Sequence, residues 1–109
     1  MKRINLSITG CMGRMGQQLI RSAKKNKKFN LVSLTENRRL NKKIAGISPE
    51  FNSINAFKKA QVIVDFTVPK STIEIIKIAS KQKKRVVIGT TGFTKKEENI
   101  IKKISKKIP

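Results

Sequence analysis

The sequence of 109 residues contains no histidine, tryptophan or tyrosine, and it has only one cysteine. A single cysteine cannot form an internal disulfide, and a chain without histidine lacks the Cys/His clusters of zinc sites. After the first residues, apolar and polar side chains alternate, which excludes the apolar core of a signal peptide. Nothing approaches the roughly 18 apolar residues of a membrane span. These absences predict a soluble, cytoplasmic protein without a metal site.

Acidic residues are also scarce: 26 lysines and arginines oppose six acids, which gives a net charge of +20. Such an excess would suit nucleic acid or an acidic surface. The lysines are nevertheless spread along the chain, and the five phenylalanines are not interleaved with them as a base-stacking platform requires. We therefore favour solvated lysine faces, and a basic nucleic-acid-binding module is the alternative.

The periodicity of apolar residues predicts alternating strands and helices within one domain, residues 1–109. Strands are expected at residues 4–9, 31–35, 62–66 and 85–88. A first helix is expected from about residue 15 to the lysines at 24–28, and a second, short one at 55–60. A third is expected to start at Pro69, with a capping box at Ser71-x-x-Glu74. A fourth is expected from a capping box at Thr94-x-x-Glu97 to Ile108. Residues 37–53 lack periodicity and are expected to form a loop. This alternation predicts an α/β fold with a Rossmann-like, doubly wound parallel sheet.

Glycine is sparse as well, yet three of the six glycines fall in the turn G-C-M-G-R-M-G at residues 10–16. Glycines there permit a tight turn and close approach of a pyrophosphate, while the following helix supplies free N–H groups. Glu36 ends the second expected strand, where an acid meets the adenosine ribose hydroxyls of a dinucleotide. The glycine spacing is one residue longer than the usual fingerprint, so a turn that binds nothing is the alternative. Position and spacing together favour a dinucleotide site.

The residues that follow Glu36 bear on which dinucleotide binds. Glu36 alone favours NADH, because its charge repels a ribose phosphate, whereas the segment Asn37-Arg38-Arg39 offers bidentate partners for that phosphate. A solvated loop explains these arginines equally well. Both NADH and NADPH are therefore expected.

Two further turns follow expected strands. The turn G-T-T-G at residues 89–92 offers backbone groups and hydroxyls suited to the nicotinamide ribose or carboxamide. Asp65, in the neighbouring turn, either touches the ligand or serves as a local backbone acceptor. From their residue types alone, Cys11 and Met12 are expected to be loop residues only.

Three segments resemble the signatures of one family: G-C-M-G-R-M-G at 10–16, D-F-T-V-P at 65–69 and V-I-G-T-T-G-F at 87–93. In order and spacing they are similar to dihydrodipicolinate reductase, now called 4-hydroxy-tetrahydrodipicolinate reductase. The resemblance implies that residues 10–15 wrap the cofactor pyrophosphate, that Glu36 takes the adenosine ribose, and that residues 89–91 hold the nicotinamide end. Asn37 departs from the arginine often found beside the acid, which puts an NADPH preference in doubt. The implied cofactor-binding residues are Gly10, Cys11, Met12, Gly13, Arg14, Met15, Glu36, Asn37, Gly89, Thr90 and Thr91.

The resemblance also implies an activity, which is hydride transfer from NADH or NADPH to a small anionic cyclic dicarboxylate in lysine and diaminopimelate biosynthesis. Family members are more than twice as long, and their second domain carries the catalytic histidine, a substrate-binding lysine and the homotetramer interface. This chain has no histidine, so we assign it no catalytic residue and expect a monomeric cofactor domain with little or no turnover alone. A piece of a longer protein, one domain taken alone and the product of a shortened gene all remain open.

Overall fold

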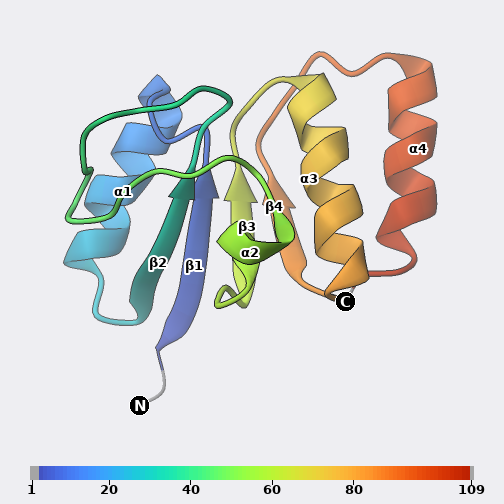
Figure 1. Cartoon of the computed structure of the whole chain (residues 1–109). Coiled ribbons are helices and arrows are strands. Elements are labelled where there is room, and N and C mark those ends of the chain that lie inside the picture. Colours follow the sequence, from blue (N-terminus) through green and yellow to red (C-terminus); the bar gives the residue numbers. More distant parts are fainter. Residues whose placement is uncertain (1–2, 109) are drawn as a thin grey trace.

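The centre of the molecule is a four-stranded parallel sheet, seen in a computed structural model that describes residues 3–108 (Figure 1). Its strands are β1 (Ile4–Thr9), β2 (Phe29–Thr35), β3 (Val62–Asp65) and β4 (Arg85–Ile88). They lie in the order β2-β1-β3-β4, so the chain moves outward from β1 in one direction and then outward from β3 in the other. A sheet of this kind has its switch point between the two central strands, here β1 and β3. The predicted doubly wound parallel sheet is confirmed.

Four helices follow the strands and cover parts of both sheet faces. They are α1 (Arg14–Lys25), α2 (Ile54–Phe57), α3 (Pro69–Lys81) and α4 (Lys95–Ser105). On the α1 face, Ile8 and Leu34 pack with Ile20 of α1. On the opposite face, Ile63 packs with Phe57 of α2 and with α3. The alternation of side chains along each strand thus divides the apolar residues between two core clusters.

Both helix starts predicted at Pro69 and Thr94 are confirmed, but only one of the two predicted capping boxes is. The capping box of α4 is confirmed, because the Thr94 hydroxyl accepts the Glu97 N–H and the Glu97 carboxylate accepts the Thr94 N–H. The box at Ser71-x-x-Glu74 is wrong: α3 has Val68 as its N-cap without a side-chain cap, and Ser71 lies inside the helix. Pro69 explains the difference, since its fixed φ and missing N–H suit the first helical position.

The register between β1 and β2 shifts by one residue, at the point where Leu6 pairs with Leu31 and Ser7 pairs with Ser33. Val32 therefore has no partner on β1 and forms a β-bulge. The strand also begins at Phe29, two residues before its predicted start. The bulge interrupts the regular alternation of side chains along this strand.

Part of the α1 face carries no helix within residues 3–108. An apolar groove there is lined by residues of all four strands and by α1, among them Leu6, Val62 and Val64. Val87 of β4 borders the groove and is 55% exposed. Parallel sheets are usually covered on both faces, so this groove is an open part of the fold in the described residues.

Candidate functional site

The carboxyl ends of the strands meet at one edge of the sheet, at the top of Figure 1, where α1 and α3 also begin. A cavity of about 220 Å³ lies at this edge, and we call it the crevice. It is lined by Gly10, Gly13, Glu36, Asn37, Asn52, Phe66, Thr67, Val68 and Ser71. The lining comes from the ends of β1, β2 and β3 and from the start of α3. Ligands of open α/β sheets bind in this position, outside the switch point.

The glycines of the first turn have different roles. Gly10 adopts φ +64°, and a Cβ atom there would lie 2.5 Å from the Phe66 carbonyl oxygen, so the backbone itself requires glycine. Gly16 packs against Gly10 so closely that a side chain would collide with the Gly10 carbonyl. Gly13 differs, because its φ is −71° and a Cβ would lie 3.3 Å from that carbonyl. Gly13 thus leaves open backbone at the crevice wall, while the other two glycines are needed for the fold.

Two helices present uncapped N-termini to the crevice. The N-cap of α1 is Gly13 and that of α3 is Val68; neither makes a side-chain cap bond, and neither first turn contains an acid. First-turn N–H groups have no intrahelical partner, and the helix dipole places partial positive charge there. By contrast, α4 is closed by its capping box and by Glu97 and Glu98. The crevice is therefore suited to an anion, although none of its lining side chains is cationic.

Glu36 lies directly against the first turn, as its position in the sequence predicts. One carboxylate oxygen accepts the Met12 N–H at 3.0 Å, and the other accepts the Asn37 N–H at 3.0 Å. Each oxygen retains a second lone pair for a further donor. The structure thus brings Glu36 and Asn37 to the same crevice as Gly10 and Gly13.

Sequence reasoning missed Asn52, which lies in the irregular segment 37–53. Its side-chain oxygen is buried and has no hydrogen-bond partner among the described residues, and the residue lines the crevice. A buried acceptor without a partner is uncommon in folded proteins, and a ligand hydroxyl or amide would satisfy it. Neither periodicity nor motif spacing signals this residue. The uncapped start of α3 was also missed, though Val68-Pro69 without a capping side chain was a usable signal.

The Asp65 side chain is not the local backbone acceptor that the sequence left open as one of its two roles, and its contact with a ligand stays a prediction. Its buried carboxylate accepts hydroxyl groups from Thr9 at 2.6 Å, Thr67 at 2.7 Å and Thr90 at 3.1 Å. It also accepts the hydroxyl of Thr72 on α3. Its side-chain partners within the protein are therefore hydroxyl groups and not backbone groups. Asp65 joins β1, β3, α3 and the turn at 89–92.

The turn at residues 89–92 lies beside the crevice without lining it. Gly89 packs against the Phe66 ring, which any side chain at this position would strike. Its N–H donates to the Asp65 carbonyl at 2.8 Å. The Thr90 hydroxyl accepts the Thr67 N–H at 2.9 Å and also donates to Asp65, so it is committed within the protein. The exposed residue Thr91 and the backbone remain available to a ligand.

The remaining predicted site residues differ in exposure. Arg14 and Met15 are exposed in the first turn of α1. Cys11 is fully buried in the α1-face core, so only its backbone can face a ligand. Burial raises the pKa of its thiol from 9.0 to about 11, and the negative charge of Glu36 adds to the shift. Met12 faces a different cavity, which is described below.

We expect Asp65→Ala to lower the free energy of unfolding by about 2–4 kcal/mol, because hydrogen bonds to charged groups each contribute about 1.5–3 kcal/mol. The measurement is denaturant unfolding followed by circular dichroism. Glu74→Ala, at an exposed acid of the same α3 helix, is the matched control and should change stability by less than about 0.5 kcal/mol. Equal effects of the two changes would show that the threonine hydroxyls do not depend on Asp65.

We expect native Cys11 to resist alkylation at pH 8. Its raised pKa keeps the thiol protonated, and only the thiolate is nucleophilic. The rise in pKa from 9.0 to about 11 reduces the thiolate fraction about a hundredfold, so iodoacetamide should react with the folded protein at least about a hundredfold more slowly than with the denatured chain. The rates are measured by mass spectrometry. Rapid labelling of the folded protein would contradict the buried position.

Within residues 3–108, no three His, Cys, Asp or Glu side chains are grouped to hold a metal ion. In the same part of the chain, no helix has the length and apolar character needed to cross a membrane. The cytoplasmic location and the domain extent of 1–109 stay predictions.

Comparison with known proteins adds evidence of descent. The family model "Dihydrodipicolinate reductase, N-terminus" matches residues 4–109. The 4-hydroxy-tetrahydrodipicolinate reductase of Pelagibacter ubique is 65% identical over 109 residues, which is 100% of this chain and 42% of that protein. The enzyme of that name from Bdellovibrio bacteriovorus is 38% identical over 112 residues, covering 100% and 43%.

Solved structures support the fold. A dipicolinate-bound dihydrodipicolinate reductase from Paenisporosarcina sp. TG-14 superposes with a TM-score of 0.76 at 24% identity, covering 94% of this chain and 43% of that one. A D-galactose-1-dehydrogenase from Rhizobium etli has a TM-score of 0.74 at 21% identity, with 98% and 35% coverage. The chain thus spans less than half the length of these relatives. Because the family model matches almost the whole sequence, the chain belongs to the dihydrodipicolinate reductase family and corresponds to its N-terminal part.

Proposed function

We propose that this chain binds NADH or NADPH and forms the cofactor-binding part of a 4-hydroxy-tetrahydrodipicolinate reductase. The observation that carries the proposal is the crevice between the uncapped N-termini of α1 and α3, with Glu36 hydrogen-bonded across the glycine turn. A dinucleotide needs anion-binding groups and ribose acceptors side by side, and the crevice offers both. Family membership and the shape of the fold support the same function.

The residues present fit the cofactor at its pyrophosphate and ribose. The first-turn N–H groups of α1 and the open backbone at Gly13 would hold the pyrophosphate. Glu36 would accept adenosine ribose hydroxyls, and the unpartnered Asn52 oxygen would accept a further donor. The backbone at 89–92 and the Thr91 hydroxyl would hold the nicotinamide end, where the bound cofactor supplies the hydride. The Thr90 side chain would act indirectly, by fixing this turn to Asp65.

A cavity next to the crevice would receive the adenosine end. It has a volume of about 370 Å³ and is lined by Arg38, Arg39, Pro49, Glu50, Phe51 and Ser53. Asn37 and Asn52 line the crevice, and their neighbours along the chain, Arg38, Phe51 and Ser53, line this cavity. A guanidinium group stacks on aromatic rings and pairs with phosphates. We propose that Arg38 and Arg39 allow NADPH to bind although Glu36 disfavours its extra phosphate.

The reductase reaction requires more than this chain offers. Reduction of a cyclic imine-type dicarboxylate needs a proton donor as well as a hydride, and the 109 residues contain no histidine. We propose that the proton donor and the substrate contacts come from the part of the relatives that lies beyond the matched region. The tetramer implied by the resemblance and the expected monomeric state of this chain both stay predictions.

The first test is a fluorescence titration of the folded chain with NADH at low and high salt. Saturable binding is expected at both, because a built site depends less on salt than nonspecific attraction of phosphates to lysines does. Gly13→Val and Glu36→Lys should each weaken binding about tenfold or more, since they block the open backbone or remove hydrogen bonds worth about 1.5–3 kcal/mol. Glu74→Lys, an exposed charge reversal on α3, should leave the affinity within about twofold.

Circular dichroism and unfolding curves would show that the variants fold. This check matters at Gly13, because its φ is accessible to any residue but an added Cβ would lie 3.3 Å from the Gly10 carbonyl oxygen, a tight contact that requires a small shift. An NADH affinity that both site variants leave unchanged would contradict the assignment. Binding that disappears at high salt would instead favour the basic nucleic-acid-binding alternative.

Cofactor preference gives a separate prediction. Replacing Arg38 and Arg39 together by alanine should weaken NADPH binding about tenfold to a hundredfold, because charge-assisted bonds to phosphate are worth about 1.5–3 kcal/mol. NADH binding should change by no more than about threefold. Parallel titrations with the two cofactors measure the ratio, and Lys58→Ala with Lys59→Ala controls for the loss of two positive charges. An unchanged ratio would mean that these arginines are only solvated loop residues.

A further inference from the structure

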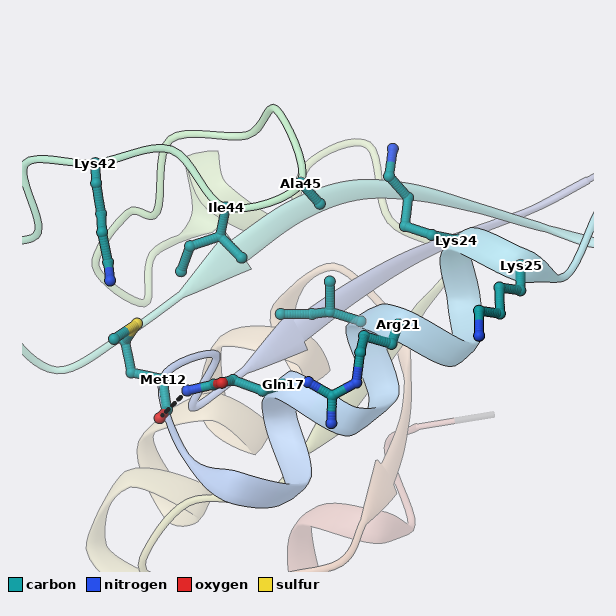
Figure 2. A pocket seen from close by; sticks show the side chains of 9 residues that line it. Met12, Gln17, Arg21, Lys24, Lys25, Lys42, Ile44 and Ala45 are labelled. Carbon is teal, nitrogen blue, oxygen red and sulfur yellow. Dashed lines mark hydrogen bonds between the residues drawn. The ribbon is translucent and has the colours of Figure 1, made fainter.

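A second and larger cavity lies between α1 and the loop at residues 37–53 (Figure 2). We call it the α1 pocket. Its volume is about 450 Å³, within the roughly 300–1,000 Å³ typical of small-molecule sites. No residue lines both the α1 pocket and the crevice. The cofactor function proposed above therefore does not account for this cavity.

The α1 pocket combines apolar and cationic surfaces. Its apolar part consists of Met12, Ile20, Ile44 and Ala45, and Ile20 is almost fully buried. Four cations complete the lining together with Gln17: Arg21, Lys24, Lys25 and Lys42. Among the described residues, no acid lines the α1 pocket and no cation lines the crevice, although nine residues line each of them. The cations are thus gathered at this cavity and are not spread equally over the concave surfaces.

Both walls of the pocket are held in place by hydrogen bonds. On the loop side, the Ile44 and Ile47 backbones exchange two N–H···O bonds of 2.9 Å and close a two-residue turn. Ala45 in this turn has φ +53°, a left-handed conformation that costs a non-glycine residue about 1–2 kcal/mol. On the α1 side, the Gln17 amide donates to the Met12 carbonyl at 2.9 Å (Figure 2). Each wall is therefore ordered by local hydrogen bonds of its own.

Lys42 and Ile44 extend from the loop toward α1 (Figure 2), and α1 contributes Ile20 and Arg21, so each wall of the cavity carries both apolar and cationic side chains. An apolar group inside would leave water and contact Ile20 and Ile44, while an attached anion would meet Lys42 or Arg21. A neutral apolar molecule would gain only the first contact. A fully hydrated inorganic anion would gain only the second. The two surfaces together select a molecule that carries both features.

We propose that the α1 pocket is a binding site for a small amphiphilic anion, in which an aromatic ring or branched hydrocarbon carries a carboxylate, phosphate or sulfonate group. The occupant is small, because 450 Å³ accommodates one or two rings and not a polymer. The site lies outside the crevice, so its occupant is a ligand other than the part of the dinucleotide assigned there.

The probe that tests this proposal is naphthalene-2-sulfonate, which joins two apolar rings to one anion. It is titrated into the 109-residue chain labelled at isoleucine and methionine methyl groups, and binding is followed by nuclear magnetic resonance. We expect saturable shifts at Met12, Ile20 and Ile44. Neutral 2-naphthol, with the same rings, should bind at least about tenfold more weakly because it gains no charge pairing.

Two variants separate the pocket from the general positive charge of the chain. Arg21→Gln combined with Lys42→Gln should weaken sulfonate binding at least about tenfold and leave NADH affinity unchanged. Lys58→Gln combined with Lys59→Gln removes two exposed cations after α2 and should leave sulfonate binding within about twofold. Equal weakening by both pairs, the absence of saturable shifts, or shifts centred on Ile4 and the open apolar groove would each overturn the proposal. The NADH readout keeps this result separate from that of the proposed cofactor function.

Discussion

The carboxylate of Asp65 is the interaction on which the arrangement of the functional edge depends. A buried carboxylate is costly unless hydrogen bonds replace its lost water, and here hydroxyl groups from four segments do so. β1, the turn after β3, helix α3 and the turn after β4 are therefore fixed relative to one group. The crevice is lined from the first three of these segments, and the turn that would hold the nicotinamide end is the fourth. The geometry of the crevice thus depends on the buried hydrogen bonds of Asp65.

The anion binding proposed at the crevice would have an unusual basis for so cationic a protein. The chain has a net charge of +20, yet no lysine or arginine lines the crevice. The positive potential there comes from backbone N–H groups at two helix starts, which are fixed in direction by the fold. Side-chain cations gather instead at the α1 pocket and beside the adenosine-end cavity. The helix N-termini thus lie at the crevice, and lysine and arginine side chains line the two other cavities.

The features that the sequence predicted well are those set by neighbouring residues. The strand-turn-helix at 10–16, the capping box at Thr94 and the position of Glu36 at a strand end all depend on local spacing. The features it missed depend on contacts between distant segments. Nothing near Asn52 shows that its oxygen is buried at the crevice, and nothing near Thr90 shows that its hydroxyl is used by Asp65 and Thr67. At Ser71 the capping-box pattern was present, but the helix begins at Pro69, as predicted, and Ser71 therefore lies inside it.

The bulge at Val32 determines which side of the sheet each residue at the C-terminal end of β2 faces. In a regular strand Leu31 and Leu34 would face opposite sides of the sheet. Here both face α1, because the bulge turns the two residues between them, Val32 and Ser33, to the side of α2 and α3. Odd-numbered and even-numbered residues therefore exchange sides of the sheet at the bulge. Loss of one residue here would invert one half and move Glu36 away from the Met12 N–H. The number of residues between Leu31 and Glu36 is therefore tightly constrained.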